Sequence, residues 1–272
     1  MKKPYVISAE LDLANPDIVN PAAIDDFRES LDTDLSSIGK DTLWIPSSTI
    51  QNGLQRILDK TNLPVVSLDD RYVADATRYV GISRCVDEQL NDSGYAPRVG
   101  YRSIAEQLEQ VSALGQEIVI ADDVVFSGEM IGWLADELKA QGVRISGVAC
   151  GIAIREGAEK LALDGIDVDS VLTLDDVEDE ICERDFAVVP GSGRRVSTLS
   201  ANALYFDDLN GKPEQWASLP HENIEAFCIS SIERSIRLLQ PETPMQAVGN
   251  FVGYGQTDTA QERLLTRIGD EK

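Results

Sequence analysis

The fold is decided by the stretch Glu117-Ile118-Val119-Ile120-Ala121-Asp122-Asp123-Val124-Val125-Phe126-Ser127-Gly128-Glu129-Met130-Ile131. Its apolar first part predicts a strand, and the helical spacing of apolar residues predicts a helix over 129–141. Two consecutive carboxylates therefore stand at the carboxyl end of a strand, where open parallel sheets hold their ligands. A short Ser-Gly loop then enters the helix, whose first amides face the same edge. This pattern offers acceptors for sugar hydroxyls and donors for a phosphate, and a ribose 5-phosphate needs both.

The segments around this stretch alternate short β-branched runs with amphipathic ones. The alternation predicts an α/β fold, an open and mostly parallel twisted sheet with helices on both faces. The predicted strands are 43–46, 63–68, 77–83, 117–121, 143–150 and 168–174, and the predicted helices between them are 48–60, 103–114, 129–141 and 156–163.

Three regions follow from these patterns. Residues 1–40 form an N-terminal extension with a short helix that starts at Asn20-Pro21 and ends near Leu31. Residues 41–189 form the α/β core, and residues 190–272 form a helical elaboration that we expect to pack on it. The apolar stripe over 222–239 shows that this last part is ordered. The acidic segment 175–185 is predicted to be solvated.

Composition narrows the classes of function. The chain has 272 residues, with 47 Asp+Glu against 24 Lys+Arg and a net charge of −23, so we expect no nucleic-acid partner. No apolar run is long enough to cross a membrane, and residues 1–7 lack the apolar segment of a signal peptide. The four scattered cysteines suit reduced thiols, so we expect a cytoplasmic protein. The acidic surface fits either a high-salt habitat or ordinary solubility.

The quoted stretch resembles the type I phosphoribosyltransferases, whose hallmark is an apolar strand, two acids, two apolar residues and a Thr/Ser-Gly loop that opens a helix. The resemblance covers about 14 residues in detail and implies a phosphoribosyltransferase-type fold over roughly residues 41–175. It implies that Asp122 and Asp123 hold the ribose hydroxyls of phosphoribosyl pyrophosphate (PRPP), with Mg²⁺ nearby. It also implies a 5-phosphate loop made of Phe126, Ser127, Gly128, Glu129 and Met130.

The same resemblance suggests where the pyrophosphate of PRPP would lie. Candidates are Ser47 and Ser48 after the strand at 43–46, Arg71 after the next strand, and Arg98 and Arg102 in a long polar segment that corresponds to a mobile flap. Each has a simpler interpretation: a helix N-cap for the serines, a surface ion pair for Arg71, and a β-hairpin or solvent loop with scattered arginines.

Two further patterns bear on chemistry. The only histidine, His221, excludes Ser-His-Asp and Cys-His catalysis, so a metal would have oxygen ligands, as Mg²⁺ prefers. Mg²⁺ is the expected cofactor, held by Asp122 and Asp123 indirectly, through PRPP and water. The segment 190–195, Pro-Gly-Ser-Gly-Arg-Arg, predicts either an anion-binding backbone nest or a surface turn.

Three hypotheses follow. The first is a Mg²⁺-dependent phosphoribosyltransferase that joins PRPP to a nitrogenous base or related nucleophile and releases pyrophosphate. The second is a non-catalytic PRPP- or nucleotide-binding regulatory protein, favoured by Phe126, Glu129 and Met130, where the family often has an acid, Gly and Thr. The third is a phosphate-ester hydrolase with Asp122 and Asp123 as metal ligands. The acceptor stays open, and so does the oligomeric state, a homodimer being the commonest closed assembly.

Overall fold

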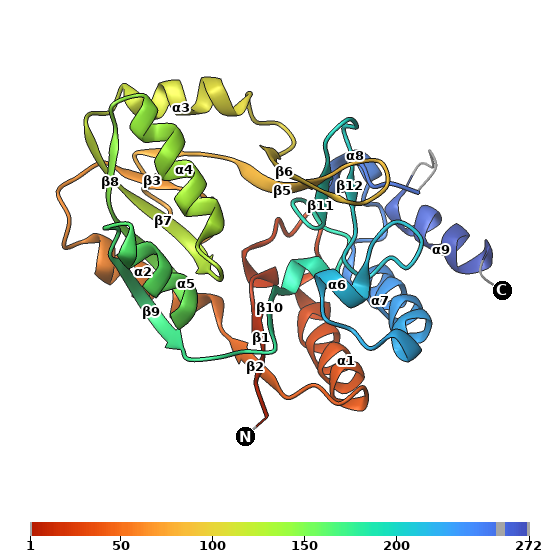
Figure 1. The fold of residues 1–272 in the computed structure, drawn as a ribbon. Coiled ribbons are helices and arrows are strands. Elements are labelled where there is room, and N and C mark those ends of the chain that lie inside the picture. Colours follow the sequence, from red (N-terminus) through yellow and green to blue (C-terminus); the bar gives the residue numbers. More distant parts are fainter. Residues whose placement is uncertain (1, 254–258, 271–272) are drawn as a thin grey trace. The chain divides into compact units, whose positions relative to one another are not determined.

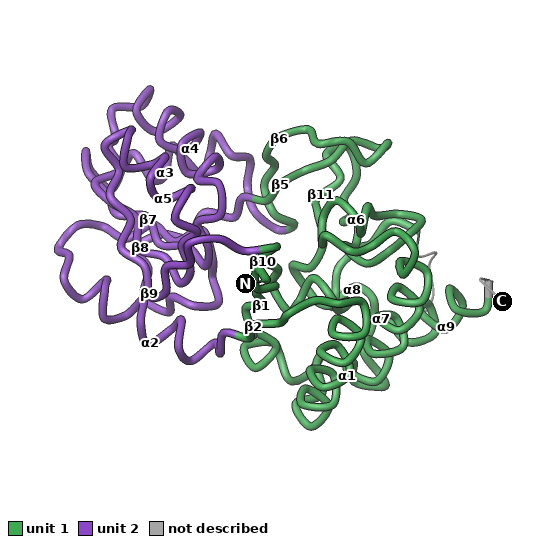
Figure 2. The backbone as a smooth tube through the Cα atoms, turned by 60° about the horizontal axis from the view of Figure 1, so that its bottom comes forward, with its two compact units in different colours: residues 1–44, 83–99, 178–272 green, residues 45–82, 100–177 purple. Residues whose placement is uncertain are grey.

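A computed structural model describes residues 2–253 and 259–270, and the chain divides into two compact units (Figures 1 and 2). Unit 1 contains residues 1–44, 83–99 and 178–272, and unit 2 contains residues 45–82 and 100–177. This division differs from the predicted boundaries after residues 40 and 189. The reason is strand pairing: segments 83–99 and 178–189 carry strands that pair with strands from the two ends of the chain.

Unit 2 is built on a five-stranded sheet of order β4-β3-β7-β8-β9. Its strands are β3 (Val65–Ser67), β4 (Arg78–Tyr79), β7 (Glu117–Val125), β8 (Arg144–Ile154) and β9 (Val168–Leu174). Every neighbouring pair in this sheet is parallel. The predicted α/β class with a mostly parallel sheet is therefore confirmed.

Four helices cover the two faces of this sheet: α2 (Ser47–Leu58), α3 (Ile104–Ser112), α4 (Glu129–Ala140) and α5 (Arg155–Leu163). Helix α2 packs on β8 and β9, where Gly53 and Gly151 leave room for it. Helices α3, α4 and α5 lie side by side on the opposite face, as Figure 2 shows. Gly142 ends the turn after α4 in a left-handed conformation, at φ +80°.

Two predicted strands of the core are placed differently by the structure. The strand predicted at 117–121 continues to Val125, so Asp122 and Asp123 lie inside β7 rather than after it. The strand predicted at 43–46 is β2 (Thr42–Ile45), which pairs with β1 (Tyr5–Ser8) and not with the parallel sheet. Strand β3 occupies the position beside β7 instead. Hydrophobic pattern identified the strands, but their pairing is a long-range property that periodicity does not encode.

Unit 1 holds two smaller sheets. The three-stranded sheet has the order β10-β1-β2, with β10 (Asp179–Cys182) parallel to β1. The four-stranded sheet has the order β12-β11-β5-β6, made of β5 (Ile82–Val86), β6 (Asp92–Pro97), β11 (Arg194–Val196) and β12 (Asn202–Ala203). The long polar segment before α3 thus forms the hairpin β5–β6, which β11 extends into a sheet.

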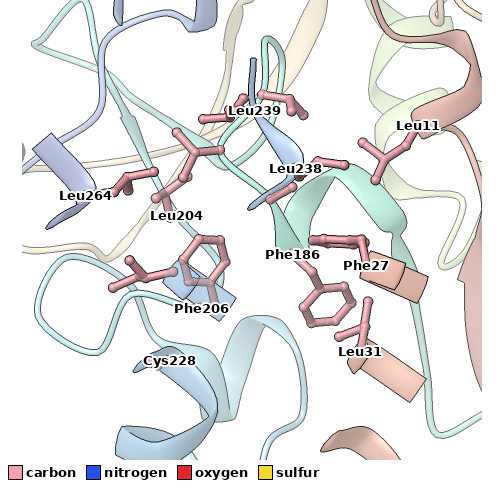
Figure 3. Close-up of a cluster of buried hydrophobic side chains, with 14 of the residues drawn as sticks. Leu11, Phe27, Leu31, Phe186, Leu204, Phe206, Cys228, Leu238, Leu239 and Leu264 are labelled. Atoms are coloured by element: carbon pink, nitrogen blue, oxygen red, sulfur yellow. The ribbon is translucent and has the colours of Figure 1, made fainter. Parts of the chain in front are cut away.

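The core of unit 1 gathers aromatic and aliphatic side chains from distant parts of the chain (Figure 3). Helix α1 (Ile24–Ser37) extends beyond the end predicted near Leu31 and packs against α7 (Ile224–Leu238). Phe186 meets Phe227 edge to face, with ring centroids 5.9 Å apart. The remaining helices are α6 (Pro213–Trp216), α8 (Met245–Val248) and α9 (Ala260–Asp270). The helix predicted from the apolar stripe over 222–239 is confirmed as α7.

The acidic segment 175–185 is not solvated throughout, contrary to the prediction. Glu183 is fully buried, and its carboxylate accepts the backbone N–H groups of Glu10 and Leu11 and the guanidinium of Arg28. Arg184 is also buried and pairs with Glu10 at 2.8 Å. These partners offset the desolvation of the charges, which composition alone cannot reveal.

The cysteines and the hydropathy of the helices bear on two other sequence expectations. Cys85, Cys150, Cys182 and Cys228 are all buried free thiols, as predicted. Within the described part of the chain, no helix is long and apolar enough to cross a membrane.

We predict that Asp179→Asn changes the pH dependence of stability. Burial raises the pKa of the Asp179 carboxyl above its ordinary value of 3.8, partly opposed by the hydroxyl of Ser218, which donates at 2.7 Å. The folded state therefore keeps this proton to higher pH than the unfolded state, so this stabilising contribution is complete below pH 3.8 and is lost as pH rises through the folded pKa. The free energy of urea unfolding, variant minus wild type, should be more positive at pH 7 than at pH 4. Parallel curves over that range would contradict the prediction.

Candidate functional site

The two adjacent carboxylates of β7 lie where its neighbour β3 has already ended. Ser67, the last residue of β3, is in register with Ala121, whereas β8 continues beside β7 to Val125. Asp122 and Asp123 are 3% and 8% exposed. The backbone N–H of Asp123 donates to Asp122 Oδ1 at 3.1 Å, and that of Val124 donates to Asp123 Oδ1 at 2.8 Å. The carboxylates thus accept hydrogen bonds from backbone N–H groups of β7 itself, beyond the point where β7 pairs with β3.

The carboxylates point to opposite faces of the sheet, because successive residues of a strand alternate. Asp122 is in register with Cys150, so Asp123 shares its face with Gly151. A Cβ on Gly151 would lie 2.6 Å from Ile50 Cγ2 and 2.8 Å from the Asp123 carbonyl oxygen. Since Ile50 lies in the first turn of α2, the start of that helix lies at the carboxyl end of β8, beside Asp123.

The loop after β7 turns into α4 through a left-handed residue. Gly128, at φ +72°, is the N-cap of α4, a conformation that costs glycine little. The Ser127 hydroxyl accepts the Glu129 N–H at 3.4 Å. The next amides of the first turn have no carbonyl partner within the helix and carry the positive end of its dipole. The sequence-predicted phosphate loop is therefore a strand-to-helix turn with donors directed outward.

Helix α5 packs against this loop where Gly157 of the helix meets Gly128 of the loop. A Cβ on Gly157 would lie 2.1 Å from the Phe126 carbonyl oxygen, and a Cβ on Gly128 would lie 2.9 Å from the Gly157 carbonyl oxygen. Backbone therefore packs directly on backbone at this point. The position of the loop depends on the absence of side chains at both residues.

Three residues differ from the type I motif, and each has different surroundings in the structure. Glu129 is directed to Lys160 of α5, with its carboxylate 3.6 Å from the ammonium group, so its charge has a partner outside the loop. Phe126 is 37% exposed. Met130 is half-buried in the first turn of α4. The loop therefore presents backbone and hydroxyl donors beside an exposed ring.

The loop after β3 lies near the same edge and is fixed by Asp69. Asp69 is buried, and its Oδ1 accepts the N–H groups of Arg71 at 2.7 Å and Tyr72 at 3.1 Å. Gln51 of α2 donates to the Arg71 carbonyl at 3.2 Å, and Tyr101 donates to Asp70 at 3.2 Å. These contacts connect the loop to the first turn of α2 and to the segment before α3.

The predicted pyrophosphate residues fall into two groups. Ser47 and Ser48 form the first turn of α2, and Ser47 is buried. Together with Arg71 and Arg102 they belong to unit 2, near the end of the sheet that carries the carboxylates. Arg98 follows β6 and belongs to unit 1. The serines follow the strand predicted at 43–46, as expected, but that strand is β2, which pairs with β1 and does not belong to the parallel sheet.

The electrostatics of the site are acidic and affect a neighbouring thiol. Burial, and then the negative charges of Asp122 and Asp123, raise the pKa of the Cys150 thiol well above its usual range. Cys150 therefore stays a neutral thiol and does not act as a nucleophile. Among the described residues, no three His, Cys, Asp or Glu side chains are grouped to hold a metal ion.

The second predicted anion site, at 190–195, is a turn that leads into β11 at Arg194. The Ser192 N–H donates to the Val189 carbonyl at 3.1 Å, and the Gly193 N–H donates to Asp185 Oδ1 at 2.9 Å. Because internal acceptors take these amides, they do not form an anion-binding nest.

Sequence reasoning missed three residues that shape the site. Asp69 is one of them, although an acid directly after a strand and before a turn is a familiar signal for backbone capping. Gly157 follows a strand by three residues, yet nothing local shows which backbone it meets. Tyr101 was seen only as part of the polar segment, and its contact with Asp70 spans 31 residues.

Comparison with solved structures finds phosphoribosyltransferases. The chain is similar to Leishmania donovani UMP synthase (16% identity, TM-score 0.30), covering 47% of this chain and 27% of that chain. It is similar to Mycobacterium tuberculosis orotate phosphoribosyltransferase in complex with PRPP (16%, 0.30), covering 47% and 73%. It is also similar to Thermoanaerobacter pseudethanolicus adenine phosphoribosyltransferase (14%, 0.32), covering 46% and 77%.

These similarities do not assign a family or an activity to this chain, because their TM-scores are about 0.3. The similarity to the UMP synthase also spans only about a quarter of that protein. No protein-family profile matches the chain, and no curated protein is significantly similar to it in sequence. Any functional assignment therefore depends on the residues of the site.

We predict that Gly157→Ala displaces the loop at 126–128. The added methyl group would overlap the Phe126 carbonyl, and overpacking of this kind costs about 1–3 kcal/mol in unfolding free energy. The matched control is Gly132→Ala in α4, where a Cβ meets no atom within 4 Å and alanine favours the helix. Urea unfolding of both variants measures the difference. Equal stability of the two variants would contradict the backbone-on-backbone contact.

Proposed function

We propose that this protein is a phosphoribosyltransferase that uses PRPP and a nitrogenous base or related nucleophile. The observation that carries the proposal is the juxtaposition at the end of β7: two buried adjacent carboxylates followed within three residues by a loop whose donors face outward. This matches the two needs of a phosphorylated ribose, hydroxyl recognition and phosphate recognition, in one short segment. The resemblance of residues 117–131 to the type I motif supports the same ligand.

Each part of the segment has a defined role in this proposal. Asp122 and Asp123 accept hydrogen bonds from the ribose hydroxyls and orient the sugar. Their negative charge also favours the positive charge that develops at the anomeric carbon as the bond to pyrophosphate breaks. The Ser127 hydroxyl and the first-turn amides of α4 hold the 5-phosphate, since anions bind well at such a helix start.

Pyrophosphate then leaves near cationic and hydroxyl groups of the same edge. The first turn of α2 offers Ser47 and Ser48, and the loop after β3 offers Arg71. Arg102 precedes the N-cap of α3 in the same unit. We propose that these arginines neutralise the departing pyrophosphate, because guanidinium groups match phosphate oxygens in pairs.

Asp122 and Asp123 could hold Mg²⁺ only together with oxygen atoms of the ligand and of water. Asp122 and Asp123 supply hard carboxylate oxygens, but the described residues provide no cage of three or more such ligands. The ion would therefore be held by these two carboxylates, through ligand oxygens and water, in the manner Mg²⁺ tolerates. Its contribution would be to neutralise charge on the pyrophosphate.

A second candidate keeps the ligand and omits the reaction. Phe126 occupies a position where an acid would be needed to move a proton near the base, and it is exposed. This observation favours a PRPP- or nucleotide-binding regulatory protein. The pairing of Glu129 with Lys160, however, supports the transferase, because the glutamate charge has a partner outside the loop.

The proposal predicts that Asp122→Asn and Asp123→Asn each weaken PRPP binding in the presence of Mg²⁺ by at least about tenfold. Loss of one charge-assisted hydrogen bond costs about 1.5–3 kcal/mol. The matched control is Asp136→Asn, which removes the same charge from an exposed position on α4. Calorimetric titration measures the dissociation constants. Equal affinities for all four proteins, or no binding by the wild type, would contradict the proposal.

Pyrophosphate release then separates the two candidates. Wild-type protein that binds PRPP and releases pyrophosphate with at least one purine or pyrimidine base is an enzyme. Binding without release across the bases supports the regulatory protein. Release of inorganic phosphate that depends on Asp122 and Asp123 would instead support a phosphate-ester hydrolase.

A further inference from the structure

Two arginines lie side by side on one face of the four-stranded sheet in unit 1. Strands β5 and β11 are parallel, with Arg195 in register with Cys85 and Val196 in register with Val86. Arg194 is therefore beside Arg84, and residues in register on parallel strands point to the same face. Val86, Val196 and Trp216 belong to one apolar cluster, which identifies the same face as that of the arginines. Figure 2 shows β5, β11 and α6 together.

The guanidinium of Arg194 is fixed by two aromatic rings. Its Cζ lies 4.8 Å from the ring centroid of Trp216 and 5.4 Å from that of Tyr205. The two rings are themselves 5.9 Å apart. Cation–π contacts of this kind orient a guanidinium group without neutralising its charge. The Nε of Arg194 is buried without a hydrogen-bond partner, so one donor of this oriented group is unused.

The charge at this place is not balanced. Arg84 and Arg194 place two positive charges next to each other on one face of the sheet, in a chain with a net charge of −23. Like charges directly opposite each other on neighbouring strands destabilise a sheet. One acid, Asp185, is near Tyr205 and accepts the Gly193 N–H. Arg84 and Arg194 together carry two positive charges and Asp185 one negative charge, so the net charge of this group is positive.

Tyr205 adds a third donor. Burial, and then the charge of Asp185, raise the pKa of its phenol to about 12, while Arg194 and Arg84 act in the opposite direction. The hydroxyl therefore keeps its proton at neutral pH. The Arg194 side chain donates a hydrogen bond to this oxygen, and its Cζ lies over the ring of Tyr205.

We propose that Arg84, Arg194 and the Tyr205 hydroxyl bind a phosphoryl group, either a phosphate or a pyrophosphate. Two guanidinium groups offer paired donors to several oxygens, which suits a doubly charged oxyanion better than a carboxylate with two oxygens and one charge. The site consists of unit 1 residues only, whereas the site around Asp122 consists of unit 2 residues. It does not depend on the function proposed for the latter.

The test is calorimetric titration of inorganic pyrophosphate into the full chain at low ionic strength. Arg84→Gln should weaken binding at this site at least tenfold. The matched control is Arg237→Gln, which removes the same charge from an exposed position on α7 in the same unit and should leave the affinity unchanged. Arg194→Lys, which keeps the charge but loses the planar fork, should weaken binding to a smaller extent.

The titrations are repeated in an Arg71→Gln/Arg102→Gln background, which removes cations assigned above to pyrophosphate, so that ligand at the other site does not obscure the result. Pyrophosphate binding that persists there and is lost on adding Arg84→Gln supports the proposal whatever the fate of the transferase assignment. Inorganic phosphate in place of pyrophosphate shows which of the two anions the site takes. Equal affinities for Arg84→Gln and Arg237→Gln, or no binding in the Arg71→Gln/Arg102→Gln background, would overturn it.

Discussion

The pairing of β7 with β8 beyond the end of β3 is the constraint on which the site depends. Because β8 continues to support β7 through Val125, two carboxylates remain in extended backbone although their other neighbouring strand has stopped at Ser67. Their oxygens then bond adjacent amides of the same strand. A strand that ended at Ala121 would leave the acids in a loop, without a fixed direction. Register between two parallel strands thus sets the geometry of the whole candidate site.

Glycines on the neighbouring elements make that arrangement possible. Gly151 of β8 lets the first turn of α2 approach Asp123, and Gly157 of α5 lets backbone pack on the loop after Val125. In both places a single methyl group would meet a carbonyl oxygen at less than 3.0 Å. The site is therefore held by close backbone packing from both faces of the sheet. Such packing restricts motion of the loop more than side-chain contacts would, because the main chain has no rotamers to adjust.

Much of this could be read from the sequence, because the signals were local. Apolar runs and helical spacing located the strands and helices of unit 2, and the pair Asp122-Asp123 before Ser127-Gly128 marked the site. What failed depended on long-range pairing. The strand at 43–46 has the same pattern as the core strands, yet β2 pairs with β1. Glu183 reads as a solvated acid until Arg28, 155 residues away, is placed beside it. That Arg84 and Arg194 share one face of a sheet likewise follows only once the register between β5 and β11 is known.

Hydrogen–deuterium exchange of the intact chain, with and without PRPP and Mg²⁺, tests the central claim most directly. If the turn between β7 and α4 holds the phosphate, the amides of residues 126–131 become protected when ligand is added, while α9, Ala260–Asp270, keeps its exchange rates. Additional protection of residues 69–72 would support the assignment of the loop after β3 to the pyrophosphate. Unchanged exchange over 126–131 at saturating PRPP would contradict the assignment of this turn as the phosphate site.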